Sequence, residues 1–189
     1  MSEQHEQRRG VTTFRGRPVT VLGPELGVGD PAPRFTVVGP DMAPVTAESL
    51  AGAVRLLSSV PSLDTPVCDL QTRRFDEAVA ALDGVTVLTV STDLPFAQAR
   101  WSTAAGTTGV RLASDHRDLS FGLAHGVVVA ELRLLARAVF VIDADDTVVH
   151  VEYVPAADQL PDVDAAVAAA RAAAERASIR RNRKDVVPL

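Results

Sequence analysis

Hydrophobic residues recur along the chain at two spacings, one typical of strands and one typical of helices. The segment 85–90 (VTVLTV) is apolar and β-branched, as in a buried strand. Similar apolar runs at 53–59 and 138–143 predict two further buried strands. Between 66 and 82, by contrast, apolar residues recur at helical spacing. Strands and helices are therefore expected to alternate through the middle of the chain.

The helix predicted over 66–82 has one apolar face and clear signals at both ends. Thr65 is a candidate N-cap, and Pro66 stands where the first helical residue would be. Asp83 and Gly84 follow the last apolar position and end the helix. The residues that this face is expected to bury are Val67, Leu70, Phe75, Val79 and Leu82.

Other patterns complete the expected order of elements. Residues 11–22 alternate around Gly16-Arg17-Pro18, which predicts a β-hairpin near the N-terminus. The alternation of strands and helices predicts an α/β fold, with a central mixed β-sheet flanked by helices on both faces. The remaining expected strands are 34–38, 110–113 and 147–154, and the remaining helices are 95–105, 119–124 and 162–177.

Most of the chain is expected to form one domain. Its 189 residues, of which 47% are hydrophobic, are enough for a single core. We expect a disordered lead over 1–10, the folded domain over 11–177 and a basic tail over 178–189. No apolar run is long enough to span a membrane, and the net charge of -5 argues against a broad nucleic-acid surface. Because no apolar stretch follows Arg8 and Arg9, we expect no signal peptide and a cytoplasmic location.

The chain has a single cysteine, Cys68, in the first turn of the helix predicted over 66–82. One cysteine excludes an intramolecular disulfide and a multi-cysteine zinc site, and the four histidines lack metal-ligand spacing. Free N–H groups and the helix dipole at a helix N-terminus favour the thiolate, which is the nucleophilic form. Position alone leaves two possibilities open, a reactive thiol and a buried inert one.

The residues before Cys68 have the form P-x-x-x-T-x-x-C, with Pro61 and Thr65 at its other fixed positions. This pattern resembles the active-site signature of the peroxiredoxins, and the longer run SVPSLDTPVCDLQTRRF resembles their bacterial thiol peroxidase subfamily. The runs VTVLGPELGVGDPAPRFTVV, VSTDLPFAQARW and LLARAVFVID resemble other parts of the same subfamily, in the same order. The resemblance covers about residues 12–175. It implies a thioredoxin-like fold, thiol-dependent reduction of hydrogen peroxide and organic hydroperoxides, and no cofactor.

The resemblance also implies roles for four residues. Cys68 would attack one peroxide oxygen and become a sulfenic acid. Thr65 would hydrogen-bond the thiolate and the peroxide, and Pro61 would shield the thiolate from water. Arg137 would stabilise the thiolate and the negative charge that develops on the peroxide. The nearby Arg133 does not match the family position.

The chain departs from the family at Ser102, where typical members of the subfamily carry a second, resolving cysteine. Ser102 is either a natural divergence or an engineered replacement, and a serine forms no disulfide. We therefore expect a one-cysteine enzyme resolved by an external thiol: thioredoxin, a glutaredoxin-like protein or a low-molecular-weight thiol. The alternative is a peroxide sensor that passes oxidation to a partner through a mixed disulfide. The resemblance further implies a homodimer.

Overall fold

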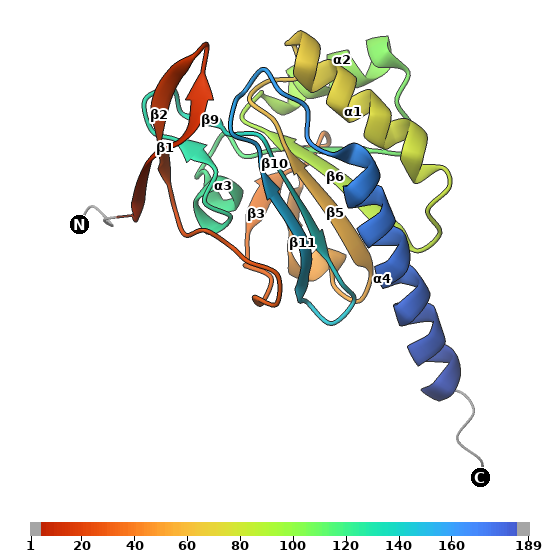
Figure 1. Ribbon diagram of the computed structural model, residues 1–189. Helices are drawn as coiled ribbons and strands as arrows, with labels where there is room; N and C mark the ends of the chain where they lie inside the picture. The colour runs from red at the N-terminus through yellow and green to blue at the C-terminus, as the bar shows by residue number, and fades with distance from the viewer. Residues whose placement is uncertain (1–4, 185–189) are drawn as a thin grey trace.

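A computed structural model describes residues 5–184, and its elements follow the expected order (Figure 1). The helices are α1 (Pro66–Val79), α2 (Pro95–Ala105), α3 (Ser120–Ala124) and α4 (Val163–Lys184), with a short 3₁₀ helix, η1, at Glu48–Leu50. The strands are β1 (Gln7–Phe14), β2 (Arg17–Leu22), β3 (Thr36–Val38), β4 (Pro44–Thr46), β5 (Val54–Ser59), β6 (Val85–Ser91), β7 (Arg111–Ser114), β8 (Val128–Val129), β9 (Leu134–Leu135), β10 (Ala138–Ile142) and β11 (Val148–Tyr153). Within the described residues, no helix is long and apolar enough to span a membrane.

The strands form two sheets. The main sheet has the order β11-β10-β5-β6-β7-β3-β4, in which β5, β6 and β7 run parallel and the other pairs run antiparallel. The predicted mixed sheet is therefore confirmed. A smaller antiparallel sheet, β1-β2-β8-β9, contains the predicted N-terminal hairpin.

Two apolar clusters cover the two faces of the main sheet. Leu56 and Leu57 are neighbours on β5 but belong to opposite clusters, because successive side chains of a strand point to opposite faces. The cluster around Leu56 includes Cys68 of α1, Trp101 of α2 and the buried alanines of α4. The cluster around Leu57 joins the sheet to α3 and to the smaller sheet. Figure 1 shows α1 and α4 on one side of the main sheet and the smaller sheet on the other.

Two segments are more ordered than the pattern predicts. Residues 7–10 were expected to belong to a disordered lead, but β1 begins at Gln7. The guanidinium of Arg8 anchors this strand through hydrogen bonds to two backbone carbonyls. Residues 178–184, expected in the basic tail, continue α4 to Lys184. Figure 1 shows this end of α4 projecting beyond the sheet.

The buried face of α1 differs from the predicted one. Leu70 was expected to be buried, but it is 42% exposed. The buried side chains are Cys68, Gln71, Thr72 and Phe75, at helical spacing. Two of these are polar, and both have hydrogen-bond partners inside the protein. Phe75 and Leu82 are buried as predicted and Val67 and Val79 are partly buried, so the predicted face is wrong at Leu70 and lacks the buried polar residues Gln71 and Thr72.

His125 is an uncharged histidine in an aromatic core. It is fully buried and stacks on Phe121 at a ring-centroid distance of 4.1 Å, with Phe35 and Phe140 at its edges. Its Nδ1 donates to the carbonyl of Phe121, and Nε2 has no partner among the described residues. Protonation would bury an N–H without an acceptor, so burial lowers the pKa of His125 to about 4.

This histidine should make stability fall in acid. Between pH 6.5 and about 4 the unfolded chain binds a proton at His125 that the folded chain does not, so the folded state loses about 3 kcal/mol. Burial raises the pKa of Asp115 to about 6, which contributes with the opposite sign. The measurement is therefore the difference in unfolding free energy between the wild type and His125→Phe, which share Asp115. From pH 7 to pH 4, urea unfolding should show the unfolding free energy of the wild type falling by about 3 kcal/mol relative to that of His125→Phe. A constant difference would contradict the prediction.

Candidate active site

The candidate nucleophile lies at the start of α1, directly after the loop that follows β5. Cys68 is fully buried in the first turn of the helix. The hydrogen bond from the N–H of Asp69 to the carbonyl of Thr65 is 2.9 Å long. The N–H groups of Val67 and Cys68 precede it and have no carbonyl one turn back within α1. The thiol therefore lies at the positive end of the helix dipole, which favours a negative charge.

Arg137 holds a second positive charge against the same sulfur. Its Nη2 donates to Cys68 Sγ at 3.3 Å and to the carbonyl of Ala157 at 2.7 Å. The side chain is 1% exposed, and among the described residues it forms no ion pair with a carboxylate. A buried cation must be paired or hydrogen-bonded, and the sulfur of Cys68 is one of the groups that meet this guanidinium.

Gln71 fixes the orientation of this guanidinium, and the sequence analysis did not single it out. Its Oε1 accepts a hydrogen bond from Nη1 of Arg137, and its Nε2 donates to Ser58 Oγ at 2.7 Å. Ser58 belongs to β5, and Gln71 lies one turn after Cys68 on α1. A strand and a helix therefore both take part in positioning the guanidinium of Arg137. The available signal was a polar residue three positions after the cysteine, on the same helical face.

Thr65 and Pro61 lie in the loop between β5 and α1. Thr65 occupies the predicted N-cap position, but its hydroxyl does not cap the helix; it donates to the carbonyl of Ser62 at 3.0 Å. With its hydrogen engaged there, the hydroxyl oxygen keeps lone pairs that can accept a hydrogen bond from a ligand. Pro61 is buried in this loop, two residues after β5 ends. Arg133, by contrast, is exposed, so of the two candidate arginines only Arg137 contacts Cys68.

Comparison with known proteins decides the family. Residues 27–167 match the Redoxin family. The chain belongs to the Redoxin family. A protein of Halalkalibacterium halodurans named thiol peroxidase is 60% identical over 161 residues, which cover 85% of this chain and 97% of that protein. The thiol peroxidase of Bacillus subtilis is 51% identical over 160 residues, covering 85% and 96%. The predicted resemblance to peroxiredoxins of the thiol peroxidase type is confirmed.

A solved structure supports the same assignment at the level of the fold. The crystal structure of a peroxiredoxin-like protein from Aquifex aeolicus superposes with a TM-score of 0.81 at 39% identity. The alignment covers 89% of this chain and 99% of that one. The predicted thioredoxin-like fold is thereby confirmed for this member of the Redoxin family.

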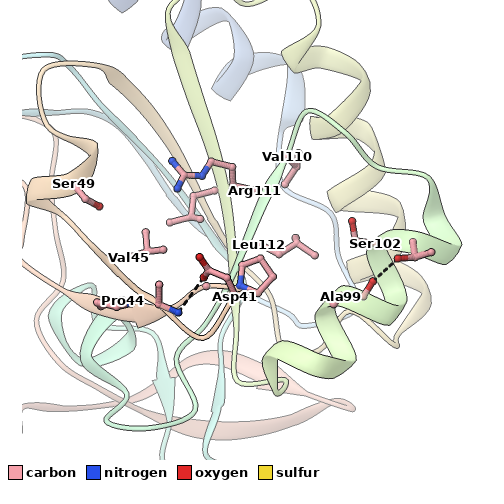
Figure 2. A pocket seen from close by; sticks show the side chains of 14 residues that line it. Asp41, Pro44, Val45, Ser49, Ala99, Ser102, Val110, Arg111 and Leu112 are labelled. Carbon is pink, nitrogen blue, oxygen red and sulfur yellow. Dashed lines mark hydrogen bonds between the residues drawn. The ribbon is translucent and has the colours of Figure 1, made fainter.

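Ser102 lies on α2 and forms no hydrogen bond with Cys68 or Arg137. Its hydroxyl shares a hydrogen bond of 2.9 Å with that of Thr107. Ser102 lines a cavity of about 660 Å³ between α2, β7 and the turn after β3. Figure 2 shows it beside Ala99 on α2. Neither Cys68 nor Arg137 lines this cavity. Within the described part of the chain, no three acidic, histidine or cysteine side chains gather in a way that could hold a metal ion.

Proposed function

We propose that Cys68 is the residue with which this chain carries out thiol-dependent peroxide reduction. The chain is a thiol-dependent peroxidase of the Redoxin family, with relatives named thiol peroxidase at 51% and 60% identity. The observation that supports Cys68 is the 3.3 Å contact between its sulfur and the buried guanidinium of Arg137. Cys68 is also the only sulfur nucleophile in the chain, since it is the single cysteine.

The proposed first step is attack by the Cys68 thiolate on one peroxide oxygen. The S–O bond forms as the O–O bond breaks, so the sulfur is oxidised to a sulfenic acid and the other oxygen leaves as alkoxide or hydroxide. The attacked oxygen keeps its hydrogen as S–OH, and the leaving oxygen takes a proton from solvent and departs as alcohol or water. Arg137 stabilises the charge as it moves from sulfur to the leaving oxygen, and the burial of the guanidinium strengthens this interaction. The Thr65 oxygen accepts a hydrogen bond from the O–H of the incoming peroxide, and buried Pro61 shields the thiolate.

The second step needs a thiol from outside the chain. Ser102 cannot reduce a sulfenic acid, so an external thiol attacks the Cys68 sulfur, releases water and leaves a mixed disulfide. A second thiol then releases Cys68 in its reduced form. Thioredoxin, a glutaredoxin-like protein and a low-molecular-weight thiol are the candidate reductants. Such reductants keep cytosolic thiols reduced, which supports a cytoplasmic location.

We propose a homodimer as the working assembly. Leu94 and Phe96 are 52% and 67% exposed where α2 begins. Asp93, the residue before them, binds the loop that carries Pro61 and Thr65. Exposed apolar side chains gathered near a site indicate a protein contact. Sedimentation velocity tests the assembly, and a monomer at micromolar concentration would contradict it.

Sustained turnover distinguishes the enzyme from the sensor. Reduced protein is mixed with excess hydrogen peroxide and, in parallel reactions, with each of the three candidate reductants. We expect at least one reductant to sustain many turnovers per chain, measured as peroxide consumed over time. Consumption of a single equivalent per chain with every reductant would contradict the enzyme and favour the sensor.

A further inference from the structure

The carboxylate of Asp93 joins the end of β6 to the loop that precedes Cys68. It accepts hydrogen bonds from Ser62 Oγ at 2.9 Å, from the N–H of Leu63 at 2.8 Å and from Ser91 Oγ at 2.8 Å. Ser91 in turn accepts a hydrogen bond of 2.9 Å from the buried amide of Gln98. Asp93 and Gln98 belong to the run DLPFAQ, for which neither the sequence nor the proposed mechanism supplies a role.

The position of Ser62 determines the position of Thr65. The carbonyl of Ser62 accepts two hydrogen bonds from Thr65, one from its backbone N–H at 3.2 Å and one from its hydroxyl at 3.0 Å. Pro61 directly precedes Ser62 in the chain. The loop residues proposed to shape the peroxide site are therefore tied to Ser62, and Ser62 is tied to Asp93.

The contact between Cys68 and Arg137 is built from other elements. Arg137 is held by Gln71 of α1 and by the carbonyl of Ala157. Asp93 forms no recorded hydrogen bond with either residue of the pair within the described chain. A change at Asp93 should therefore move the peroxide-binding loop and leave the sulfur and its cation in place.

We propose that Asp93 is a positioning residue for peroxide: it holds the loop 61–65 so that Thr65 and Pro61 meet the incoming O–O bond. The inference rests on the proposed role of Cys68. Asp93 is thus expected to raise the rate constant for the reaction with peroxide without raising the reactivity of the thiol toward other reagents. Its carboxylate acts as a hydrogen-bond acceptor, and its negative charge is not required.

The test compares two reactions of the same sulfur in Asp93→Ala, Asp93→Asn and the wild type. Stopped-flow kinetics gives the rate constant with hydrogen peroxide, and iodoacetamide alkylation gives the reactivity of the thiol toward a reagent that does not use the loop. We expect Asp93→Ala to lose about 10- to 100-fold with peroxide, since small misplacements near reacting atoms have effects of this size. Alkylation should not fall, because the contact between the sulfur and Arg137 is retained and a displaced loop shields the sulfur less.

The asparagine variant separates geometry from charge. Its amide oxygen can accept from Leu63 and its amino group can donate to Ser62 Oγ, so the loop keeps its anchor. We expect Asp93→Asn to recover to within about 3-fold of the wild type. The matched control is Asp41→Ala, which removes an exposed carboxylate that accepts the N–H of Ala43 at 3.0 Å in the turn between β3 and β4. Both rates should be unchanged in this control.

Each result bears on the inference in a defined way. Equal losses in both reactions, or no loss in either, overturn it. A peroxide loss of similar size in Asp93→Asn overturns the claim that the acceptor geometry matters. If Asp93→Ala does not fold, Ser62→Ala replaces it, and a peroxide rate equal to that of the wild type then overturns the proposal. A wild type that is alkylated but does not react with peroxide refutes the proposed role of Cys68 instead.

Discussion

Replacing Arg137 with alanine is expected to slow the reaction of Cys68 with hydrogen peroxide by about 10²- to 10³-fold, the usual cost of removing one preorganised donor from a developing negative charge. The reason is the position of the guanidinium, which is buried and lies 3.3 Å from the sulfur. Its loss removes the counter-charge of the thiolate and the group that stabilises the leaving oxygen. Stopped-flow measurement of the second-order rate constant checks the prediction.

The control for this experiment is Arg133→Ala. Arg133 is exposed, so its removal deletes the same charge from the chain without touching the site. Its rate constant should stay within about 2-fold of the wild type, as is usual for a screened surface charge. Equal losses in the two variants would show that net charge, and not the contact with sulfur, is responsible. Thermal unfolding of both variants shows whether a loss reflects an unfolded protein.

Cys68→Ser is expected to abolish peroxide consumption, leaving only the rate in buffer. An alcohol does not reduce peroxide, and the variant has no sulfur nucleophile because Cys68 is the only cysteine. Intact mass after one equivalent of peroxide, with a sulfenic-acid trap, provides the direct readout. The wild type should carry one trap molecule on Cys68, and the variant should carry none.

Ser102→Ala is the matched control for the cysteine replacement. The Ser102 hydroxyl bonds only with Thr107 among the described residues, and it lines the cavity of Figure 2 without contacting Cys68. Trapping and turnover with an external thiol should match the wild type. Loss of turnover in Ser102→Ala, with trapping intact, would show that position 102 takes part in the resolving step.

The central elements of the fold were predictable because each carries a local signal. The strands β5, β6 and β10 are short and largely buried runs between turn signals, and α2 lies where Pro95 predicts a first turn. The short strands β8 and β9 were not predicted, because a two-residue strand is too short to show an alternating pattern; they pair with each other, and β8 also pairs with the distant β2. The extra order of β1 likewise depends on distant contacts of Arg8.

The candidate site was predictable in part for the same reason. The pattern around Cys68 is continuous in sequence, so Pro61 and Thr65 could be named from it. Arg137 lies 69 residues after Cys68, and only the resemblance pointed to it. Gln71 and Asp93 were not singled out, because their importance lies in hydrogen bonds across elements that no periodicity encodes.

The chain also contains a built-in optical probe of its reactive helix. Trp101 is the only tryptophan, so intrinsic tryptophan emission comes from one place. Its indole N–H donates to Asp69 at 3.0 Å, next to Cys68 in sequence, and the guanidinium of Arg73 lies 5.7 Å from the ring centre. Any shift of the first turn of α1 during oxidation or reduction changes the polar surroundings of this ring. The redox cycle can therefore be followed in real time by fluorescence, without attaching a dye.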